Sequence, residues 1–269
     1  MDSDRIKEAI ARLTPEQRIA LEERLRTKLQ PGRTRNGIPR RSDRSKYPLS
    51  PAQVRLWSLS RLRPDDPVYN IDAVWRLRGS LDAASLEIAL RTLLDRHESL
   101  RARIETRSGI PVQSLRAASE FTLETAFLDD TRDDVLSKEI NRLISEPFDL
   151  ASDPLFRATL IHVGDDDQVL VVVAHHIVCD GLSMGILASE LGPAYAAARS
   201  ETQPDLPELE LTYADVAQWQ IDTQPGANDL RYWDETLTAD LQPLRLPRSR
   251  ADQVGRRMDG ATLAFEIEG

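Results

Sequence analysis

The chain has 269 residues, of which 41% are hydrophobic, and this is enough to bury a sizeable core as one large or two small domains. Its formal net charge of −9 argues against nucleic acid as a general partner. No apolar run reaches membrane-spanning length, the charged N-terminus does not resemble a signal peptide, and the single cysteine, Cys179, cannot form an internal disulfide. We therefore expect a cytoplasmic protein that binds neither nucleic acid nor membrane.

The first 30 residues are predicted to form a small helical segment. Ile6, Ile10 and Leu13 recur at helical spacing, and a second periodic run follows Thr14, which begins a capping box. Two helices this short bury little apolar surface against each other. Residues 1–30 are therefore expected to dock on another surface or to stay partly mobile.

Residues 31–46 are predicted to be a basic flexible linker. A single acid, Asp43, stands against six basic residues, and two glycines and two prolines interrupt the run. We interpret the segment as a solvated tether. A nucleic-acid-binding arm is the weaker interpretation, because no aromatic residues interleave with the charges. The basic residues are Arg33, Arg35, Arg40, Arg41, Arg44 and Lys46.

From residue 47 onward, apolar patterns of helix and strand follow one another, which predicts a layered α/β domain. Ser50 is the expected N-cap of the first helix, and Leu86, Leu90, Leu93 and Leu94 line one face of the second. The expected helices span 51–61, 82–97, 134–145 and 183–199. The expected strands span 69–77, 100–105, 122–127, 157–163 and 168–174, with a further strand at 261–268.

The strand at 168–174 leads into two adjacent histidines, His175 and His176. Neighbouring side chains on a strand point to opposite sides, so one histidine can face a cleft while the other is held in the structure. Asp180 could fix a ring, a turn or an arginine, and Gly181 permits a tight turn and close approach of a ligand to the backbone. This layout is typical of one working histidine with its support nearby.

Other interpretations of the histidine pair are less favoured. Polar residues often end a strand without any further role. A zinc site lacks a spaced Cys/His set elsewhere, because the other histidines are His97 and His162. A Ser-His-Asp triad lacks the G-x-S-x-G turn that positions the serine. We therefore expect no metal and no serine nucleophile.

Four ordered motifs carry a resemblance to a known family. The residues from His175 to Gly181 resemble the H-H-x-x-x-D-G signature of condensation domains in nonribosomal peptide synthetases. Residues 49–57 are similar to the family's S-x-A-Q-x-R-L-W motif, 96–101 to R-H-E-x-L-R, and 213–219 to Y-x-D-Y-A-x-W. The resemblance covers residues 47–269, and its further motif residues are Arg55, Trp57, Arg96, Arg101, Arg157, Tyr213 and Trp219.

The resemblance implies a chloramphenicol-acetyltransferase-like layered α/β lobe. A condensation domain has two such lobes, and the family's later motifs are missing from this chain. We expect the first lobe at 47–225 and the start of the crossover to the second, missing lobe at 226–269. Because the family's active site lies in a tunnel between the lobes, we expect the fragment to be inactive alone.

The reaction that the resemblance implies is formation of an amide bond. The amine of an acceptor aminoacyl thioester attacks the thioester carbonyl of a donor, and both substrates are carried on phosphopantetheine arms, with no cofactor bound directly. His176 is expected to act as general base or to position the amine, and His175 to be structural. Asp180 is expected to form a salt bridge, with Arg157 as its partner, and Gly181 to place an amide near the reacting carbonyl. For the other motif residues, packing and buried ion pairs are the expected roles.

The implied partners are an upstream donor and a downstream acceptor peptidyl carrier protein. Residues 1–30 are either a docking element for the C-terminus of an upstream subunit or an ordinary inter-module segment. Residues 182–187 and 68–71 resemble the subtype that accepts an L-configured donor, although starter domains with a fatty acyl donor look similar. An interaction module without chemistry, and a free-standing acyltransferase that uses coenzyme A thioesters, are the alternative functions.

Overall fold

The computed structural model describes residues 37–41, 47–128, 132–223 and 227–237. The chain divides into two compact units, residues 1–224 and 225–269. The helices predicted within 1–30 and the strand predicted at 261–268 lie outside the described residues. Among the helices that are described, none is both long and apolar enough to cross a membrane.

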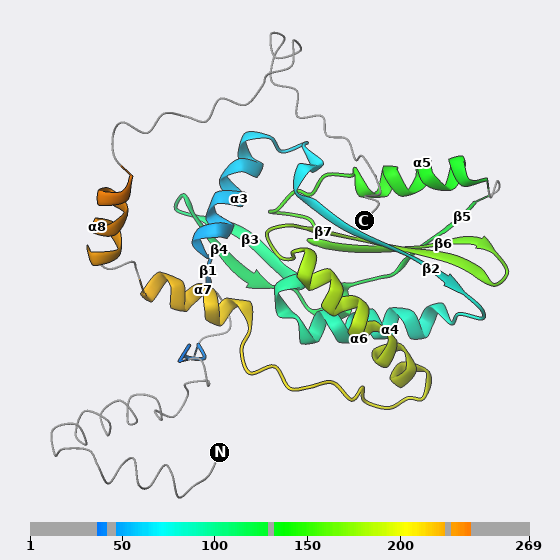
Figure 1. Ribbon diagram of the computed structural model, residues 1–269. Helices are drawn as coiled ribbons and strands as arrows, with labels where there is room; N and C mark the ends of the chain where they lie inside the picture. Colours follow the sequence, from blue (N-terminus) through cyan, green and yellow to red (C-terminus); the bar gives the residue numbers. More distant parts are fainter. Residues whose placement is uncertain (1–36, 42–46, 129–131, 224–226, 238–269) are drawn as a thin grey trace, which may run out of the picture. The chain divides into compact units, whose positions relative to one another are not determined.

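A four-stranded mixed sheet forms the centre of the first unit (Figure 1). Its order is β2 (Asn70–Arg78), β7 (Asp167–His175), β6 (Phe156–Gly164) and β5 (Glu124–Phe127). β7 pairs antiparallel with β2 and β6, whereas β5 runs parallel to β6. β7 is buried along almost its whole length, which explains its continuous apolar run. The central strand therefore leads directly to the two histidines.

Helices cover both faces of this sheet, as Figure 1 shows. α4 (Ala83–Arg96) and α6 (Gly181–Arg199) pack against each other on one face, and α5 (Asp133–Ile144) lies on the other. α4 buries the four leucines that were predicted to line its inner face. The predicted layered α/β fold is confirmed.

A second, three-stranded sheet has the order β1 (Tyr47–Pro48), β4 (Ile110–Leu115) and β3 (Ala102–Arg107). α7 (Tyr213–Asp222) contacts β1 and α3 (Pro51–Leu62). α3 begins at the predicted cap, because the Ser50 hydroxyl oxygen accepts the backbone N–H of Gln53 at 3.2 Å. Short 3₁₀ turns η1 (Pro67–Tyr69), η2 (Glu98–Arg101) and η3 (Ala118–Glu120) join these elements.

The predicted helices and strands of 51–199 are present, with ends shifted by up to two residues in most cases. β4 was not predicted, because Pro111 interrupts its apolar pattern. It forms a hairpin with β3 through Ser108 and Gly109, whose φ angles of 50° and 82° suit a two-residue turn of type I′. Residues 98–101, partly predicted as strand, form the turn η2 instead.

In the second unit, α8 (Ala227–Thr236) places the rings of Tyr232 and Trp233 edge to face, with centroids 5.2 Å apart.

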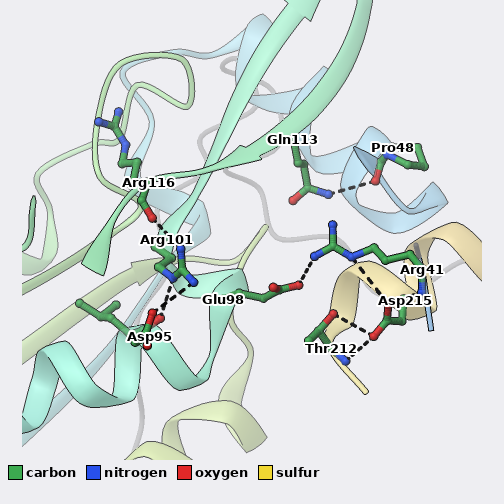
Figure 2. A network of polar contacts seen from close by, with 10 residues as sticks. Arg41, Pro48, Asp95, Glu98, Arg101, Gln113, Arg116, Thr212 and Asp215 are labelled. Atoms are coloured by element: carbon green, nitrogen blue, oxygen red, sulfur yellow. Dashed lines mark hydrogen bonds and ion pairs between the residues drawn. The ribbon is translucent and has the colours of Figure 1, made fainter. Parts of the chain in front are cut away.

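Arg41 departs from the solvated linker that the sequence predicts. Its side chain is 5% exposed and forms ion pairs with Glu98 and Asp215, whose side chains are 8% and 5% exposed (Figure 2). Its backbone N–H donates to Asp215 at 2.9 Å, and its guanidinium lies 4.3 Å from the centroid of the Tyr47 ring. Burial, followed by the charge of Glu98, raises the pKa of the Tyr47 phenol, so this ring stays neutral. The basic segment is thus anchored to the lobe at Arg41.

Replacing Arg41 should test this anchor. In Arg41→Met, the carboxylates of Glu98 and Asp215 stay buried without their cation, and the free energy of unfolding should fall by about 3–5 kcal/mol in urea titrations. Arg40→Met is the matched control, because Arg40 is exposed and lies 3.9 Å from the exposed Glu208. The control should change the free energy of unfolding by no more than about 0.5 kcal/mol. Equal losses in both variants would contradict the anchor.

Candidate active site

The two adjacent histidines lie on opposite sides of the chain at the end of β7. His175, the last residue of the strand, is 4% exposed, whereas His176 is exposed at the surface of the lobe. One histidine is thus buried and its neighbour exposed, as predicted, although the difference arises because β7 ends at His175 and His176 lies in the turn that follows. His176 is therefore the member of the pair that is accessible from solvent.

His175 is a buried, neutral histidine. Its ring packs against the rings of Tyr69 and Phe148, with centroids 6.1 Å away in both cases. Its Nδ1 accepts the backbone N–H of Ile177 at 3.0 Å, which requires that this nitrogen carry no proton. Burial, followed by the nearby His176, lowers the pKa of His175 to about 4. The ring therefore holds the backbone as a hydrogen-bond acceptor.

His176 is held by its backbone and by one ring nitrogen. Its backbone N–H donates to the carbonyl oxygen of Tyr69 at 2.7 Å, and its ring Nδ1 lies 2.9 Å from the carbonyl oxygen of Cys179. Because a carbonyl oxygen can only accept, Nδ1 carries the proton of the neutral ring and Nε2 has the free lone pair. Burial raises the pKa of the Cys179 thiol to about 11, so this side chain is a neutral thiol.

Asp180 caps a helix, and among the described residues it forms no ion pair with an arginine. It is the N-cap of α6, where its Oδ1 accepts the hydroxyl of Ser183 at 2.6 Å and the backbone N–H of Ser183 at 2.8 Å. The hydroxyl, followed by the backbone N–H, lowers the pKa of this carboxyl. The expected salt bridge between Asp180 and Arg157 is therefore wrong, because the local cap already satisfies the carboxylate.

Arg157 supports the other histidine instead. Its guanidinium donates to the carbonyl oxygens of Glu146 and Pro147 and lies 3.3 Å from the Glu146 carboxylate. It also lies 3.8 Å from the centroid of the Phe148 ring. Since Phe148 meets His175 edge-on, the guanidinium stabilises the aromatic wall of the buried histidine.

Gly181 is the first residue of α6, and its backbone φ is not in the left-handed region. The conformational freedom of glycine, which would permit a tight turn here, is therefore not used. A Cβ at Gly181 would meet no atom within 4 Å, so the space in front of it is open. The open space leaves the start of α6 accessible next to His176.

The second motif fixes α6 through buried charges. Arg96 donates from Nε to both carboxylate oxygens of Glu190, at 3.2 and 3.1 Å, and His97 Nε2 lies 2.6 Å from the same carboxylate. Arg101 donates to the carbonyl oxygens of Leu94 and Arg116 at 3.1 and 2.7 Å. Both arginines thus have the packing and ion-pairing role that was expected.

The remaining motif residues lie on α3 and α7, where their contacts are with residues other than the two histidines. Arg55 is exposed on α3, so its expected burial is wrong. Trp57 is partly buried beneath the guanidinium of Arg61, which lies 5.2 Å from the ring centroid. The Tyr213 hydroxyl lies 2.9 Å from the Ser50 hydroxyl, and Trp219 is partly buried in α7.

Three buried acids were missed by sequence reasoning. Glu98 and Asp215 lie inside the quoted motifs and share Arg41, and Glu190 binds Arg96 and His97. The signal that could have found the first two is that each is the single acid in its motif, at 96–101 and at 213–219. In the part of the chain that the structure describes, no group of three or more His, Cys, Asp or Glu side chains could hold a metal ion.

The buried neutral His175 should make the lobe sensitive to acid. The unfolded chain binds a proton at this histidine near pH 6.5, whereas the folded chain binds it only near pH 4. The contribution of His175 to the free energy of unfolding is therefore fully present above pH 6.5. It is lost as the pH is lowered toward 4, and the total loss is about 3 kcal/mol. Urea titrations at several pH values in this window should show the decrease.

His175→Asn is the matched control, because the Asn side-chain oxygen can accept the N–H of Ile177 without titrating. Relative to this variant, the wild type should lose about 2 kcal/mol more between pH 7.5 and pH 5. Parallel pH profiles for the two proteins would contradict a buried neutral histidine.

Comparison with known sequences identifies the protein family to which this chain is similar. The family model "Condensation domain" matches residues 43–269. A dimodular nonribosomal peptide synthase from Bacillus subtilis is 37% identical over 231 residues, which are 83% of this chain and 10% of that protein. Phosphinothricin tripeptide synthetase PhsC from Streptomyces viridochromogenes is 36% identical over 266 residues, which are 96% of this chain and 24% of that protein. The chain thus spans less than a quarter of each of these relatives.

Solved structures agree with the sequence comparison. The X-domain from teicoplanin biosynthesis, solved in complex with OxyB, is 29% identical with a TM-score of 0.69, and the match covers 78% of this chain and 47% of that one. The SgcC5 protein from Streptomyces globisporus is 31% identical with a TM-score of 0.56, over 65% of this chain and 42% of that one. The layered fold, the motifs and these similarities together show that the chain belongs to the condensation-domain family of nonribosomal peptide synthetases.

Proposed function

We propose that this chain supplies the histidine of an amide-forming acyltransferase, with His176 acting on the amine of an aminoacyl acceptor. The observation that carries the proposal is the ring geometry of His176. Its Nδ1 is committed to the carbonyl oxygen of Cys179 at 2.9 Å, while the ring is exposed. With Nδ1 as the protonated nitrogen, the lone pair on Nε2 can accept a proton from a group that approaches the exposed ring.

The proposed reaction joins two thioester-bound substrates. The acceptor amine attacks the thioester carbonyl of the donor, so a C–N bond forms and the C–S bond breaks. His176 Nε2 accepts or orients the N–H proton, and the donor carrier leaves as a thiol after taking up one proton. Because the amine proton balances the proton on the leaving thiol, the step needs no further reactant.

The neighbouring residues have supporting roles in this proposal. His175 holds the backbone beside His176 and does not exchange protons, since burial lowers its pKa to about 4. Asp180 fixes the start of α6 as its N-cap, and Gly181 leaves open space at this end of the helix. The positive end of the helix dipole next to His176 suits a carbonyl oxygen that gains negative charge during the attack.

The proposed partners are donor and acceptor carrier proteins that present substrates on phosphopantetheine. Tethered substrates held in one site react at a high effective concentration, which is the physical advantage of such carriers. The matched relatives are named as a dimodular peptide synthase and a tripeptide synthetase, which supports this arrangement. Residues 1–30, which lie outside the described residues, are proposed to dock an upstream subunit or to link two modules.

A second candidate function is an interaction module without chemistry. It is favoured by one observation, because the similar X-domain was solved as a complex with the protein OxyB. In that case the histidine pair would serve only the fold, and a partner protein would bind the lobe. The two candidates differ in what removal of the His176 ring does to product formation.

Removing the His176 ring should stop the reaction without unfolding the protein. In the full-length protein that contains this chain, with loaded donor and acceptor carriers, His176→Ala should lower the rate of peptide formation roughly 100- to 10,000-fold. The ring is exposed, so the free energy of unfolding should change little. Product formation is measured by mass spectrometry, and carrier binding is measured separately by calorimetry.

His162→Ala is the matched control, because His162 stacks on Phe127 away from the end of β7. This variant should keep the wild-type rate. If His176→Ala forms product as fast as the wild type, the proposed chemistry is wrong and the interaction module becomes the better explanation.

A further inference from the structure

The amide of Gln53 makes four hydrogen bonds, one of which reaches the segment that carries His176. Gln53 lies on α3 and is 2% exposed. Its Nε2 donates to the carbonyl oxygen of Ile177 at 2.9 Å and to Gln113 Oε1 at 3.2 Å. Its Oε1 accepts the backbone N–H of Ser50 at 3.0 Å and Gln113 Nε2 at 2.8 Å. Both hydrogens and both acceptor sites are used, so the amide has one orientation.

Gln113 locks this orientation from the second sheet. It lies on β4, is 1% exposed, and forms a reciprocal amide pair with Gln53. Its second Nε2 hydrogen goes to the carbonyl oxygen of Pro48 at 3.2 Å (Figure 2). If either amide were flipped, donors would face donors and acceptors would face acceptors. The nitrogen of Gln53 is therefore held toward Ile177.

Ile177, the residue after His176, has both of its backbone groups held by buried side chains. Its N–H donates to His175 Nδ1 at 3.0 Å, and its carbonyl oxygen accepts from Gln53 Nε2 at 2.9 Å. The ring of His176 is itself tied to the carbonyl oxygen of Cys179. Rotation of the backbone at 176–178 would break at least one of these bonds. The direction of His176 Nε2 therefore depends on Gln53, which lies 124 positions away from Ile177 in the sequence.

We propose that Gln53 is a positioning residue for His176, acting through the carbonyl group of Ile177. The inference rests on the proposed function, in which His176 Nε2 acts on the acceptor amine. Gln53 does not touch the substrate in this scheme. It fixes the backbone from which the His176 ring projects. The position of this ring affects the rate, because a misplacement of a reacting group by about 1 Å can lower the rate roughly 100-fold.

Glutamate at this position is the most informative change, because it keeps the size of the side chain and removes both donors. A carboxylate in Gln53→Glu would face two oxygen acceptors, those of Ile177 and Gln113, in a buried site. Burial and these acceptors should raise the pKa of the new carboxyl above its usual range. Its protonated form has one O–H donor and can restore the bond to Ile177.

The experiment measures peptide formation by Gln53→Glu in the full-length protein with loaded carriers. At pH 8.5 we expect kcat to fall about 10- to 100-fold, with little change in KM for the acceptor carrier. The ratio of wild-type to variant rates should shrink as the pH is lowered to 6, because the variant regains its donor. Gln220→Glu, the same change at an exposed position of α7, should keep the wild-type rate at every pH.

A spectroscopic readout separates positioning from a general loss of structure. In ¹⁵N-labelled chain, His176 should show a protonated Nδ1 and an unprotonated Nε2 in the wild type, and a mixture of the two tautomers in Gln53→Glu at pH 8.5. In the wild type, the side-chain amide protons of Gln53 should exchange with solvent far more slowly than those of Gln220. This last measurement needs no variant, so it applies even if Gln53→Glu does not fold.

The outcomes distinguish this inference from the proposed function. If His176→Ala loses activity but Gln53→Glu keeps the wild-type rate and tautomer, Gln53 is not a positioning residue. Fast solvent exchange of the Gln53 amide in the wild type would overturn the inference as well. If His176→Ala is fully active, the proposed function itself fails. A lower rate that recovers with acid, together with a changed tautomer, supports the inference.

Discussion

The site depends on one hydrogen bond that only a neutral histidine can accept. His175 Nδ1 accepts the N–H of Ile177, and the surrounding burial keeps this ring unprotonated. A protonated ring would replace the acceptor by a donor and would place a charge among aromatic side chains, at a large cost in free energy. The same burial that keeps His175 out of proton transfer therefore gives it its structural role. His176 is the first residue after β7, and it is exposed because it lies in the turn beyond the end of the buried strand.

The other motifs position this strand end through buried charges. Glu190 binds Arg96 and His97 and so ties α6 to the end of α4, while Glu98 and Asp215 share Arg41 and tie α7 to the turn η2. In each cluster, a charge that would be costly to bury alone is paired with an opposite charge. Loss of either partner should therefore lower the free energy of unfolding far more than loss of an exposed ion pair. These contacts give the charged residues Arg96, Glu98 and Asp215 of the two motifs a structural role.

Much of this arrangement was predictable from the sequence, because the strongest signals are local. Helix and strand periodicities predicted the layered fold. One buried and one exposed histidine were also predicted, but from strand alternation, whereas His176 is exposed because it lies in the turn after β7. Asp180 was assigned the wrong partner, since it caps α6 and its carboxylate binds Ser183, three residues away, without any distant arginine. Arg41 was taken as solvated, because its neighbours are basic, polar or turn-forming, whereas its partners lie 57 and 174 positions away. Pairings over such distances depend on the packing of the whole lobe, which no local pattern encodes.

The lobe directs the His176 ring but leaves its reacting side open to solvent. His176, Gly181 and Leu182 are exposed together at the start of α6, with Leu182 82% exposed. A histidine in bulk water is an ordinary weak base, and the rate advantage of an enzyme comes from holding the reactants and excluding water. On the proposed function, the contacts inside the lobe therefore determine the orientation of the His176 ring, whereas the exposed face around it determines how substrates bind and how far water is excluded. Substitutions in the two places should consequently separate: those inside the lobe should act on kcat, and those on the open face, apart from His176 itself, should act mainly on KM.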